Sequence, residues 1–354
     1  MNLAGVRPPS GPGGPAALAR PEATPVPATP TPAAQAAAWA DALTAIALLE
    51  RQPHRLGGVW LRAPHGPVRE AWLQALAQQT LPVLRAPGSV DTARWLGGLD
   101  LAATLHSASV REQPGLLRQA HGGLLCLPMA ERFAPALTAT LAQTLDRGGV
   151  DQGGDFQPSR FGVVALDESL DDETPLAPAL QERLGLWIDL RELPPSAAQA
   201  SAQAHRVSSA SSVVVAGDSA LQALCGTAQA LGIDSLRVAQ RALDVACAHA
   251  EWHGRDHVAE EDLAYASRTV LAPRARQWPA QVSPQEEGVE SPETTPDHDI
   301  PEPPTDPAAE PASEPHGIPP EVNPEALQAL MVAAAAARLP PDVLQRLMTG
   351  AATT

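Results

Sequence analysis

The sequence predicts an α/β fold in which a parallel sheet flanked by helices is followed by an all-helical part, with disordered termini. Between residues 38 and 194, short apolar runs alternate with helical patterns, as in parallel sheets that are covered on both faces. From 195 to 278 only the helical period remains. Both ends are rich in proline and poor in large apolar side chains, which is typical of disordered chain.

The domain boundaries follow these changes in composition. The predicted parts are a disordered Pro/Ala-rich N-terminus (1–37), an α/β core (38–194), a helical lid (195–278), an acidic Pro-rich linker (279–323) and a short helical stub (324–354). The two helices of the stub are too short to fold alone, because isolated domains need about 40 residues or more.

Within the predicted core, five short apolar runs are the expected strands, at 59–61, 81–85, 123–127, 161–166 and 186–190. Helices are expected at 38–51, 134–147 and 176–186, and a hairpin or loop at 148–160. In the lid, the helical period predicts helices at 219–231, 235–253 and 260–270.

Residues 57–78 read as a strand, a Gly/Pro loop and a helix, which is the frame of a phosphate-binding loop. A working loop has G-x-x-x-x-G-K-[ST], but Ala63 and Val68 replace its glycines and Gly66 falls between them. Arg69 stands at the lysine position and Glu70 at the position of the metal-binding hydroxyl. The chain has no lysine at all, so the sequence predicts a degenerate loop. Residual nucleotide binding without hydrolysis and an ordinary strand–helix turn both remain open.

Charge and cysteine content limit the class of protein. The net charge is −16, and residues 283–354 hold 13 of the 40 acidic residues but two of the 24 arginines. This acidic tail argues against nucleic acid as its partner. The three cysteines have no metal-ligand spacing and indicate a reducing, cytoplasmic location. We expect no signal peptide and no membrane span, because no apolar run approaches about 18 residues.

Two polar clusters have a chemical and a structural interpretation. The acidic residues from Asp167 to Glu173 could bind a divalent cation, but a solvated loop is the favoured interpretation. His249, His253 and His257 recur every four residues, as metal ligands on a helix do. Because Gly254 is expected to end that helix, surface histidines are favoured there.

Five segments in order resemble the AAA+ module of magnesium chelatase, and specifically its non-hydrolysing D subunit. They are residues 94–105, 114–127, 160–169, 180–190 and 236–276. The resemblance covers about residues 40–278 and implies a P-loop NTPase-like sheet with a helical lid.

The departures from the family pattern fall on the chemistry of hydrolysis. A Walker B strand should end in Asp-Glu for Mg²⁺ and water activation, but Pro128 and Met129 follow the apolar run. The resemblance places Arg183 as an arginine finger acting in trans and Arg274 as the sensor-2-like arginine, with Arg276 as the alternative. Gly66 and Arg69 would be the weak remnant of the cofactor-binding loop.

The resemblance implies a subunit of a ligase-class enzyme in chlorophyll or bacteriochlorophyll synthesis. The chain would assemble with the ATPase I subunit and couple ATP hydrolysis to Mg²⁺ insertion into protoporphyrin IX by the H subunit. No cofactor of its own is expected, because ATP and Mg²⁺ would be bound by the I subunit. A full-length D subunit also has a C-terminal integrin-I-like domain, whose D-x-S-x-S metal motif is not found here. Two alternatives are an active AAA+ ATPase and an AAA+-derived adaptor of a chaperone-like complex.

Overall fold

A computed structural model describes residues 31–99, 101–107, 109, 111–152, 155–169, 175–199, 214–279 and 323–349. Nearly all of the predicted acidic linker and most of the predicted N-terminal segment lie outside the described residues. The first helix, α1 (Pro32–Arg51), begins earlier than the expected residue 38. Its start is set by Thr31, whose hydroxyl accepts the N–H of Ala34 at 3.3 Å, and by Pro32 in the first turn.

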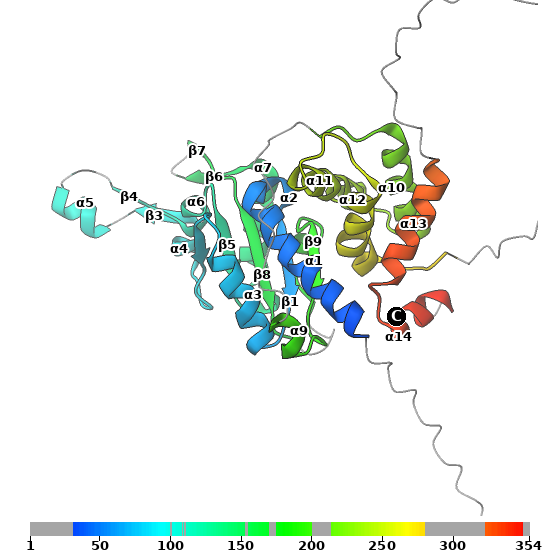
Figure 1. The fold of residues 1–354 in the computed structure, drawn as a ribbon. Coiled ribbons are helices and arrows are strands. Elements are labelled where there is room, and N and C mark those ends of the chain that lie inside the picture. Colours follow the sequence, from blue (N-terminus) through cyan, green and yellow to red (C-terminus); the bar gives the residue numbers. More distant parts are fainter. Residues whose placement is uncertain are drawn as a thin grey trace, which may run out of the picture.

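The core is a five-stranded parallel sheet, as the sequence predicts (Figure 1). Its strands are β1 (Gly58–Arg62), β2 (Val83–Arg85), β5 (Leu124–Leu127), β8 (Gly162–Asp167) and β9 (Leu186–Asp189). They lie in the order β2-β5-β8-β1-β9, so β1 is paired with β8 on one side and with β9 on the other. All four pairs of neighbouring strands are parallel, because a helical segment separates each strand from the next in the chain.

Helices cover both faces of the sheet, which explains why its strands are continuously apolar. One face packs against α1, α3 (Pro67–Ala77), α9 (Pro195–Gln199) and the lid; Val59 and Leu61 point to this side. The other face packs against α4 (Thr92–Leu96), α6 (Leu116–Gln119), α7 (Pro135–Arg147) and α8 (Pro178–Gln181); Trp60 points there. The short α2 (Pro53–Leu56) leads into β1.

Helix α1 is long and apolar enough, by length and composition alone, to cross a membrane, a property that the search for apolar runs did not detect. Its environment is that of a core helix. Trp39, Ala42, Ala45 and Leu49 are buried against the sheet and the lid. The remaining described helices do not meet this test.

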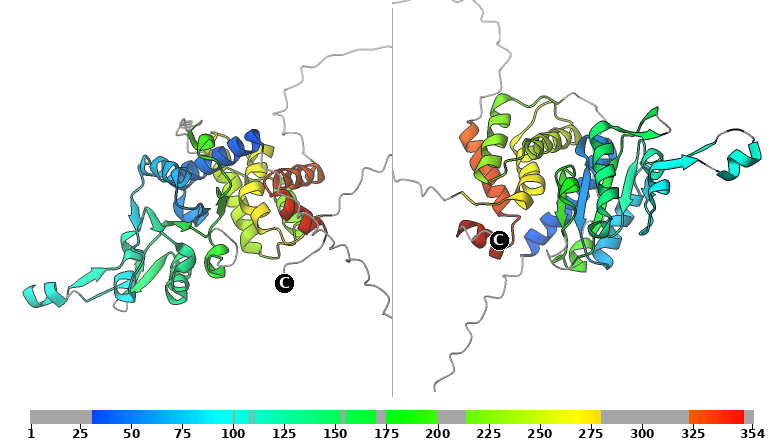
Figure 2. Two further views of the ribbon diagram at one scale, coloured as in Figure 1. Left: turned by 90° about the horizontal axis from the view of Figure 1, so that it is seen from below. Right: turned by 180° about the vertical axis from the view of Figure 1, so that it is seen from behind.

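Two hairpins interrupt the alternation of strands and helices. β3 (Gly97–Leu99) and β4 (Glu112–Pro114) pair antiparallel and carry the short α5 (Leu101–Ser107) away from the body, as Figures 1 and 2 show. β6 (Gly149–Gln152) and β7 (Asp155–Pro158) form the second hairpin, in the region expected to hold a hairpin or loop.

The lid follows β9 and packs beside the sheet (Figure 2). It contains α10 (Asp218–Ala230), α11 (Leu236–Trp252) and α12 (Glu260–Ala266), close to the expected positions. The third expected helix is shorter than predicted, because a π-helical turn, η2 (Ser267–Leu271), and a 3₁₀ turn, η3 (Ala272–Arg274), follow α12. Three acidic residues occupy the first turn of α12, where the helix dipole favours them.

The lid has a further helix from beyond the linker. α13 (Pro324–Ala336) lies against α10, α12 and η2 and buries Leu327, Met331 and Ala335. The Ser267 hydroxyl donates to the Met331 carbonyl oxygen at 2.6 Å. The predicted stub is therefore divided: α13 belongs to the lid core, and α14 (Pro341–Met348) lies at its margin.

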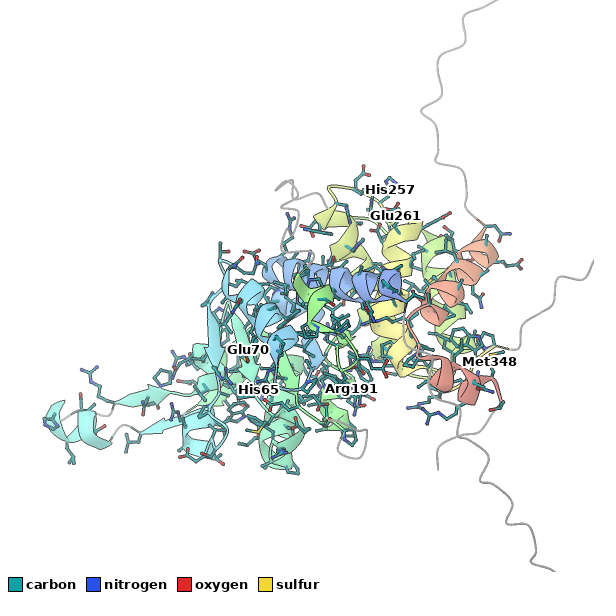
Figure 3. The ribbon with its side chains drawn as sticks, turned by 60° about the horizontal axis from the view of Figure 1, so that its bottom comes forward. His65, Glu70, Arg191, His257, Glu261 and Met348 are labelled. Carbon is teal, nitrogen blue, oxygen red and sulfur yellow. The ribbon has the colours of Figure 1, made fainter. Side chains whose placement is uncertain are left out.

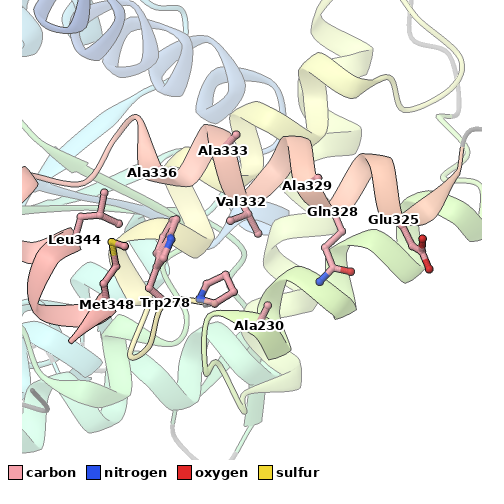
Figure 4. Close-up of a pocket in the computed structure, with 11 residues that line it drawn as sticks. Ala230, Trp278, Glu325, Gln328, Ala329, Val332, Ala333, Ala336, Leu344 and Met348 are labelled. Atoms are coloured by element: carbon pink, nitrogen blue, oxygen red, sulfur yellow. The ribbon is translucent and has the colours of Figure 1, made fainter. Parts of the chain in front are cut away.

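α14 borders a cavity of about 550 Å³, which is lined mostly by apolar side chains of α13, α14 and Trp278 (Figure 4). Leu344 and Met348 form the α14 wall, and Val332 lies opposite on α13.

Candidate functional site

The degenerate loop lies where the sequence predicts it, at the carboxyl end of β1 and before α3. Ala63 continues the strand ladder, because its N–H donates to the Asp167 carbonyl oxygen at 3.0 Å. Gly66 is the residue before α3 and Pro67 is the first residue of the helix. Pro67 has no N–H, so the start of this helix offers one donor fewer to an anion. Figure 3 shows His65 and Glu70 in this region.

Arg69, at the position of the catalytic lysine, is neutralised from within the chain. Its side chain is 6% exposed, and Nη1 lies 2.5 Å from Oε1 of Glu168. A second carboxylate, Glu70, lies 3.6 Å from Nη2. A phosphate group at this loop would have to displace a largely buried ion pair. Sequence reasoning identified the cation but not its partner, which lies 99 residues away.

The end of β8 forms the floor of the same region. Asp167 is fully buried and accepts hydrogen bonds from the Trp60 indole and the Ser169 N–H, both at 2.9 Å. Arg62 lies 3.7 Å from the same carboxylate. Asp167 is therefore a structural acceptor rather than part of a solvated loop, whereas Asp171 to Glu173 lie outside the described residues. No group of three His, Cys, Asp or Glu side chains in the described part of the chain is arranged to hold a metal ion.

Beyond β5, the chain turns sharply where a Walker B pair would stand. Met129 adopts a left-handed backbone conformation, with φ 50°. Glu131 follows, and its side chain is 2% exposed. Burial raises the pKa of Glu131, and the nearby Asp167 adds to this effect. Burial thus disfavours the charged form of the carboxyl group, which is the form that binds Mg²⁺. The sequence analysis did not single out Glu131.

Arg183 is held by its own chain. Its Nε donates to Oδ1 of Asp146 at 3.0 Å, and Nη2 contacts the other carboxylate oxygen. Two carbonyl oxygens, of Ala142 and Ala179, accept further hydrogen bonds at 3.1 and 2.6 Å. Arg183 must therefore leave Asp146 before it can serve a neighbouring molecule in a bidentate manner.

Arg274 joins the lid to the core. Its Nη2 donates to the carbonyl oxygens of Gln181 and Leu184 at 3.0 and 2.5 Å, and its guanidinium lies 3.9 Å from the centre of a Trp187 ring. Burial, with a smaller effect of Arg241, lowers the pKa of Arg274 to about 9. It remains cationic at neutral pH, because this pKa still lies above 7.

The predicted site residues fall into two groups, one at the carboxyl ends of the strands and one at their amino ends. The degenerate loop follows the carboxyl end of β1, whereas Arg183 precedes the amino end of β9, beside the start of β1. The backbones of Gly57 and Arg183 pack closely against each other. A Cβ on Gly57, whose φ is 74°, would lie 2.0 Å from the Arg183 carbonyl oxygen. Arg274 donates to the carbonyl oxygens of Leu184 and Gly185 and so lies beside Arg183. Both arginines are at the amino end of β9, whereas the loop follows the carboxyl end of β1.

The comparisons with known proteins agree with this architecture. The AAA lid domain family model matches residues 221–299. The magnesium-chelatase 60 kDa subunit of Rhodobacter capsulatus is 34% identical over 238 residues, which are 66% of this chain and 40% of that protein. The fold is an AAA+ P-loop NTPase-like parallel sheet with an AAA lid. The resemblance to magnesium chelatase that the sequence motifs indicate is confirmed.

Two further relatives are more distant. The magnesium-chelatase 67 kDa subunit of Chlorobaculum tepidum is 27% identical over 271 residues, covering 66% of this chain and 42% of that protein. An uncharacterized protein of Mycobacterium tuberculosis is 28% identical over 264 residues, covering 63% of this chain and 42% of that protein. The chain thus spans about two fifths of the length of these relatives.

The lid of the AAA+ module is fixed to its core by ion pairs that sequence reasoning missed. Asp41 of α1 accepts two hydrogen bonds from Arg268 at 2.9 and 3.0 Å. Arg55, before β1, donates to Asp244 of α11 at 2.9 Å. Arg237 of α11 donates to Asp146 of α7 at 2.6 Å. No motif indicates these pairs, because their partners are 91 to 227 residues apart.

The three spaced histidines do not form a metal site, and one of them is not on the surface. His249 is buried, with Nδ1 2.6 Å from Asp262 and its ring stacked on Tyr265 at 4.6 Å. It joins α11 to α12. Helix α11 ends at Trp252, just before Gly254, so His257 lies beyond the helix and is exposed (Figure 3).

Proposed function

We propose that this AAA+ module is a non-hydrolysing platform subunit of a magnesium chelatase. The chain assembles with the ATPase I subunit and couples its ATP hydrolysis to Mg²⁺ insertion into protoporphyrin IX by the H subunit. The observation that carries this proposal is the Arg69–Glu168 ion pair at the position of the phosphate-binding lysine. The names of the relatives, which are chelatase subunits, supply the complex.

ATP bound at this loop would have to displace Glu168 from Arg69. Because Glu168 is 27% exposed, separating this pair costs about 2–3 kcal/mol. Since each 1.4 kcal/mol is a factor of ten, this corresponds to a loss of about thirty- to a hundredfold in affinity. The missing Asp-Glu pair after β5 removes the metal ligand and the water-activating group as well. ATP and Mg²⁺ are therefore assigned to the I subunit, and any residual nucleotide binding by this chain is weak.

Arg183 retains a role in trans under this proposal, whereas Arg274 is held between the lid and the core by the carbonyl oxygens of Gln181 and Leu184. Arg183 lies at the end of the strands opposite to its own loop, so a nucleotide that it contacts belongs to a neighbouring subunit. An arginine supplied in trans stabilises charge on the transferred phosphoryl group. A module whose own phosphate-binding loop is blocked by the Arg69–Glu168 pair can thus complete the nucleotide site of its neighbour. The setting is the cytoplasm, in chlorophyll or bacteriochlorophyll synthesis.

The test combines turnover with assembly. The purified chain is assayed for ATP hydrolysis alone, and then mixed with the I subunit and analysed by light scattering after gel filtration. We expect no turnover by the chain alone and co-elution with the I subunit. Turnover that disappears in Arg69→Ala would instead establish the active ATPase. Absence of assembly would favour the adaptor, an alternative for which the uncharacterized mycobacterial relative leaves room.

A further inference from the structure

Helix α13 joins the lid to the carboxyl end of the sheet. Along its length it packs on α10, α12 and η2 of the lid. Just beyond its last turn, Nη2 of Arg338 donates to the Asp189 carbonyl oxygen at 3.1 Å. Asp189 ends β9 and is paired in register with Arg62, the last residue of β1 before the degenerate loop. Residues 324–338, which we call the strap, thus contact both the lid and the core.

Met331 is the central anchor of the strap. It is fully buried, and Leu327 and Ala335, four residues before and after it, are buried on the same face of the helix. The Thr227 hydroxyl of α10 lies 3.6 Å from the Met331 sulfur. The Ser267 hydroxyl of η2 donates to the Met331 carbonyl oxygen at 2.6 Å. Met331 therefore holds the strap to α10 and to η2 at once.

The π-helical turn η2 contacts the strap and the core through consecutive residues. Ser267 binds the strap, whereas Nε and Nη2 of Arg268 donate to the Asp41 carboxylate of α1 at 3.0 and 2.9 Å. The Tyr265 hydroxyl, from the end of α12, donates to the Asp41 carbonyl oxygen at 3.2 Å. π-Helical turns are rare and frequently lie at functional sites. Because Ser267 and Arg268 are neighbours, a displacement of the turn at the strap also displaces the contact with α1.

The strap can leave the lid without unfolding of the sheet. Residues 280–322 lie between it and the preceding part of the lid, so its position is not fixed by a short connection. Its outer side is open: Ala326 is exposed and Val332 borders the cavity (Figure 4). A helix of 13 residues is marginal in water by itself. The strap therefore folds and docks in one step, as a local unit of low stability.

We propose that the docking of the strap on the lid is coupled, through the π-helical turn η2, to the attachment of the lid to the core. With the strap docked, η2 holds Arg268 against Asp41. When the strap leaves, this contact between lid and core weakens. The coupling is reciprocal, because each event changes the equilibrium of the other by the same factor. This inference goes beyond the proposed function and rests on the contacts of α13 and η2 alone.

The first test releases the strap in the full chain and follows hydrogen exchange by mass spectrometry. Met331→Asp places a charge in the buried contact, so α13 should lose its protection altogether. The α1 peptide that contains Asp41 should then exchange about tenfold faster, because its pair with Arg268 is loosened. Ala326→Asp adds the same charge at an exposed position of α13 and is the matched control, with exchange equal to that of the parent chain. Loss of protection in α13 with unchanged exchange in α1 would overturn the proposal.

The second test runs in the opposite direction. Asp41→Asn weakens the pair with Arg268, and exchange in α13 should become about fivefold faster, although the substitution is on α1. Glu50→Gln is the matched control, because Glu50 is also on α1 but binds Thr80. Exchange in α13 should be the same in this control as in the parent chain. Equal exchange of α13 in Asp41→Asn and Glu50→Gln would contradict the coupling.

A milder variant decides the question if Met331→Asp does not fold, which circular dichroism verifies. Ser267→Ala removes only the hydroxyl group that donates to the strap. Exchange in both α13 and the α1 peptide should become about threefold to fivefold faster, as for the loss of one hydrogen bond. Acceleration confined to α13 would again overturn the proposal. The outcome is separable from that of the proposed function, because these measurements require neither the I subunit nor a porphyrin.

Discussion

The ion pair between Arg69 and Glu168 predicts a specific response to Glu168→Gln. The substitution leaves the Arg69 guanidinium, which is 6% exposed, without its closest carboxylate. Removing one partner of a fully buried pair costs about 3–5 kcal/mol. Because Glu168 is 27% exposed, water compensates for part of the loss, and we expect destabilisation by about 2–3 kcal/mol.

The assay is equilibrium unfolding in urea, with thermal unfolding as a second measurement. For a folded unit of this size, about 2 kcal/mol lowers the Tm by roughly 4–8 °C. The matched control is Glu70→Gln, because Glu70 is 49% exposed and lies 3.6 Å from the same guanidinium. It should cost less than about 1 kcal/mol. Equal effects of the two substitutions would refute the assignment of Glu168 as the main partner of Arg69 in the degenerate loop.

The same variant has a second consequence for ligand binding. With its partner neutralised, Arg69 becomes available to an anion, so ATP should raise the Tm of Glu168→Gln and leave that of the parent chain unchanged. A ligand that binds only the folded state stabilises it in proportion to the logarithm of its concentration. A Tm increase in the parent chain alone would contradict the prediction.

Three further predictions concern the lid. Met331→Ala should destabilise the module by about 2–4 kcal/mol, because Met331 is fully buried on α13; urea unfolding measures this. Asp41→Ala should cost about 2–3 kcal/mol and increase hydrogen exchange in η2, because it leaves Arg268 unpaired. Although burial acts in the opposite direction, His249 and Arg255 lower the pKa of Asp262. Its stabilising contribution is therefore complete above pH 3.8, the ordinary pKa, and is lost as the pH falls through the lower folded value.

Each of these results has a control. Val332→Ala, on the same helix but on its cavity side, should cost less than Met331→Ala. The acid unfolding of Asp262→Asn should depend less on pH than that of the parent chain. Exchange protection of η2 that is unchanged in Asp41→Ala would contradict the assigned role of the Asp41–Arg268 pair.

The sheet could be predicted from the sequence because its strands are short apolar runs separated by helical patterns. Val59 to Leu61 and Gly162 to Leu166 lie in strands because both faces of the sheet are covered. The strand order could not be derived from periodicity, since it depends on contacts between distant segments. The early start of α1 at Pro32 was missed because alanines and prolines in that segment also fit disordered chain.

The candidate site could be predicted only in part, for the same physical reason. The loss of loop chemistry at Ala63, Val68 and Arg69 is local and therefore visible in the sequence. The partners of the arginines are not local: Glu168 closes the loop, and Asp146 holds Arg183. The docking of α13 on the lid was likewise hidden, because the segment of residues 280–322 separates it from the other lid helices.

Under the proposed function, this chain supports magnesium chelation without hydrolysing ATP itself. The most direct measurement follows magnesium protoporphyrin by fluorescence in mixtures of the I and H subunits, ATP, Mg²⁺ and protoporphyrin IX, with and without this chain. We expect magnesium protoporphyrin to form only in mixtures that contain the chain. Product formation that is the same without the chain, or ATP hydrolysis by the chain alone, would contradict it.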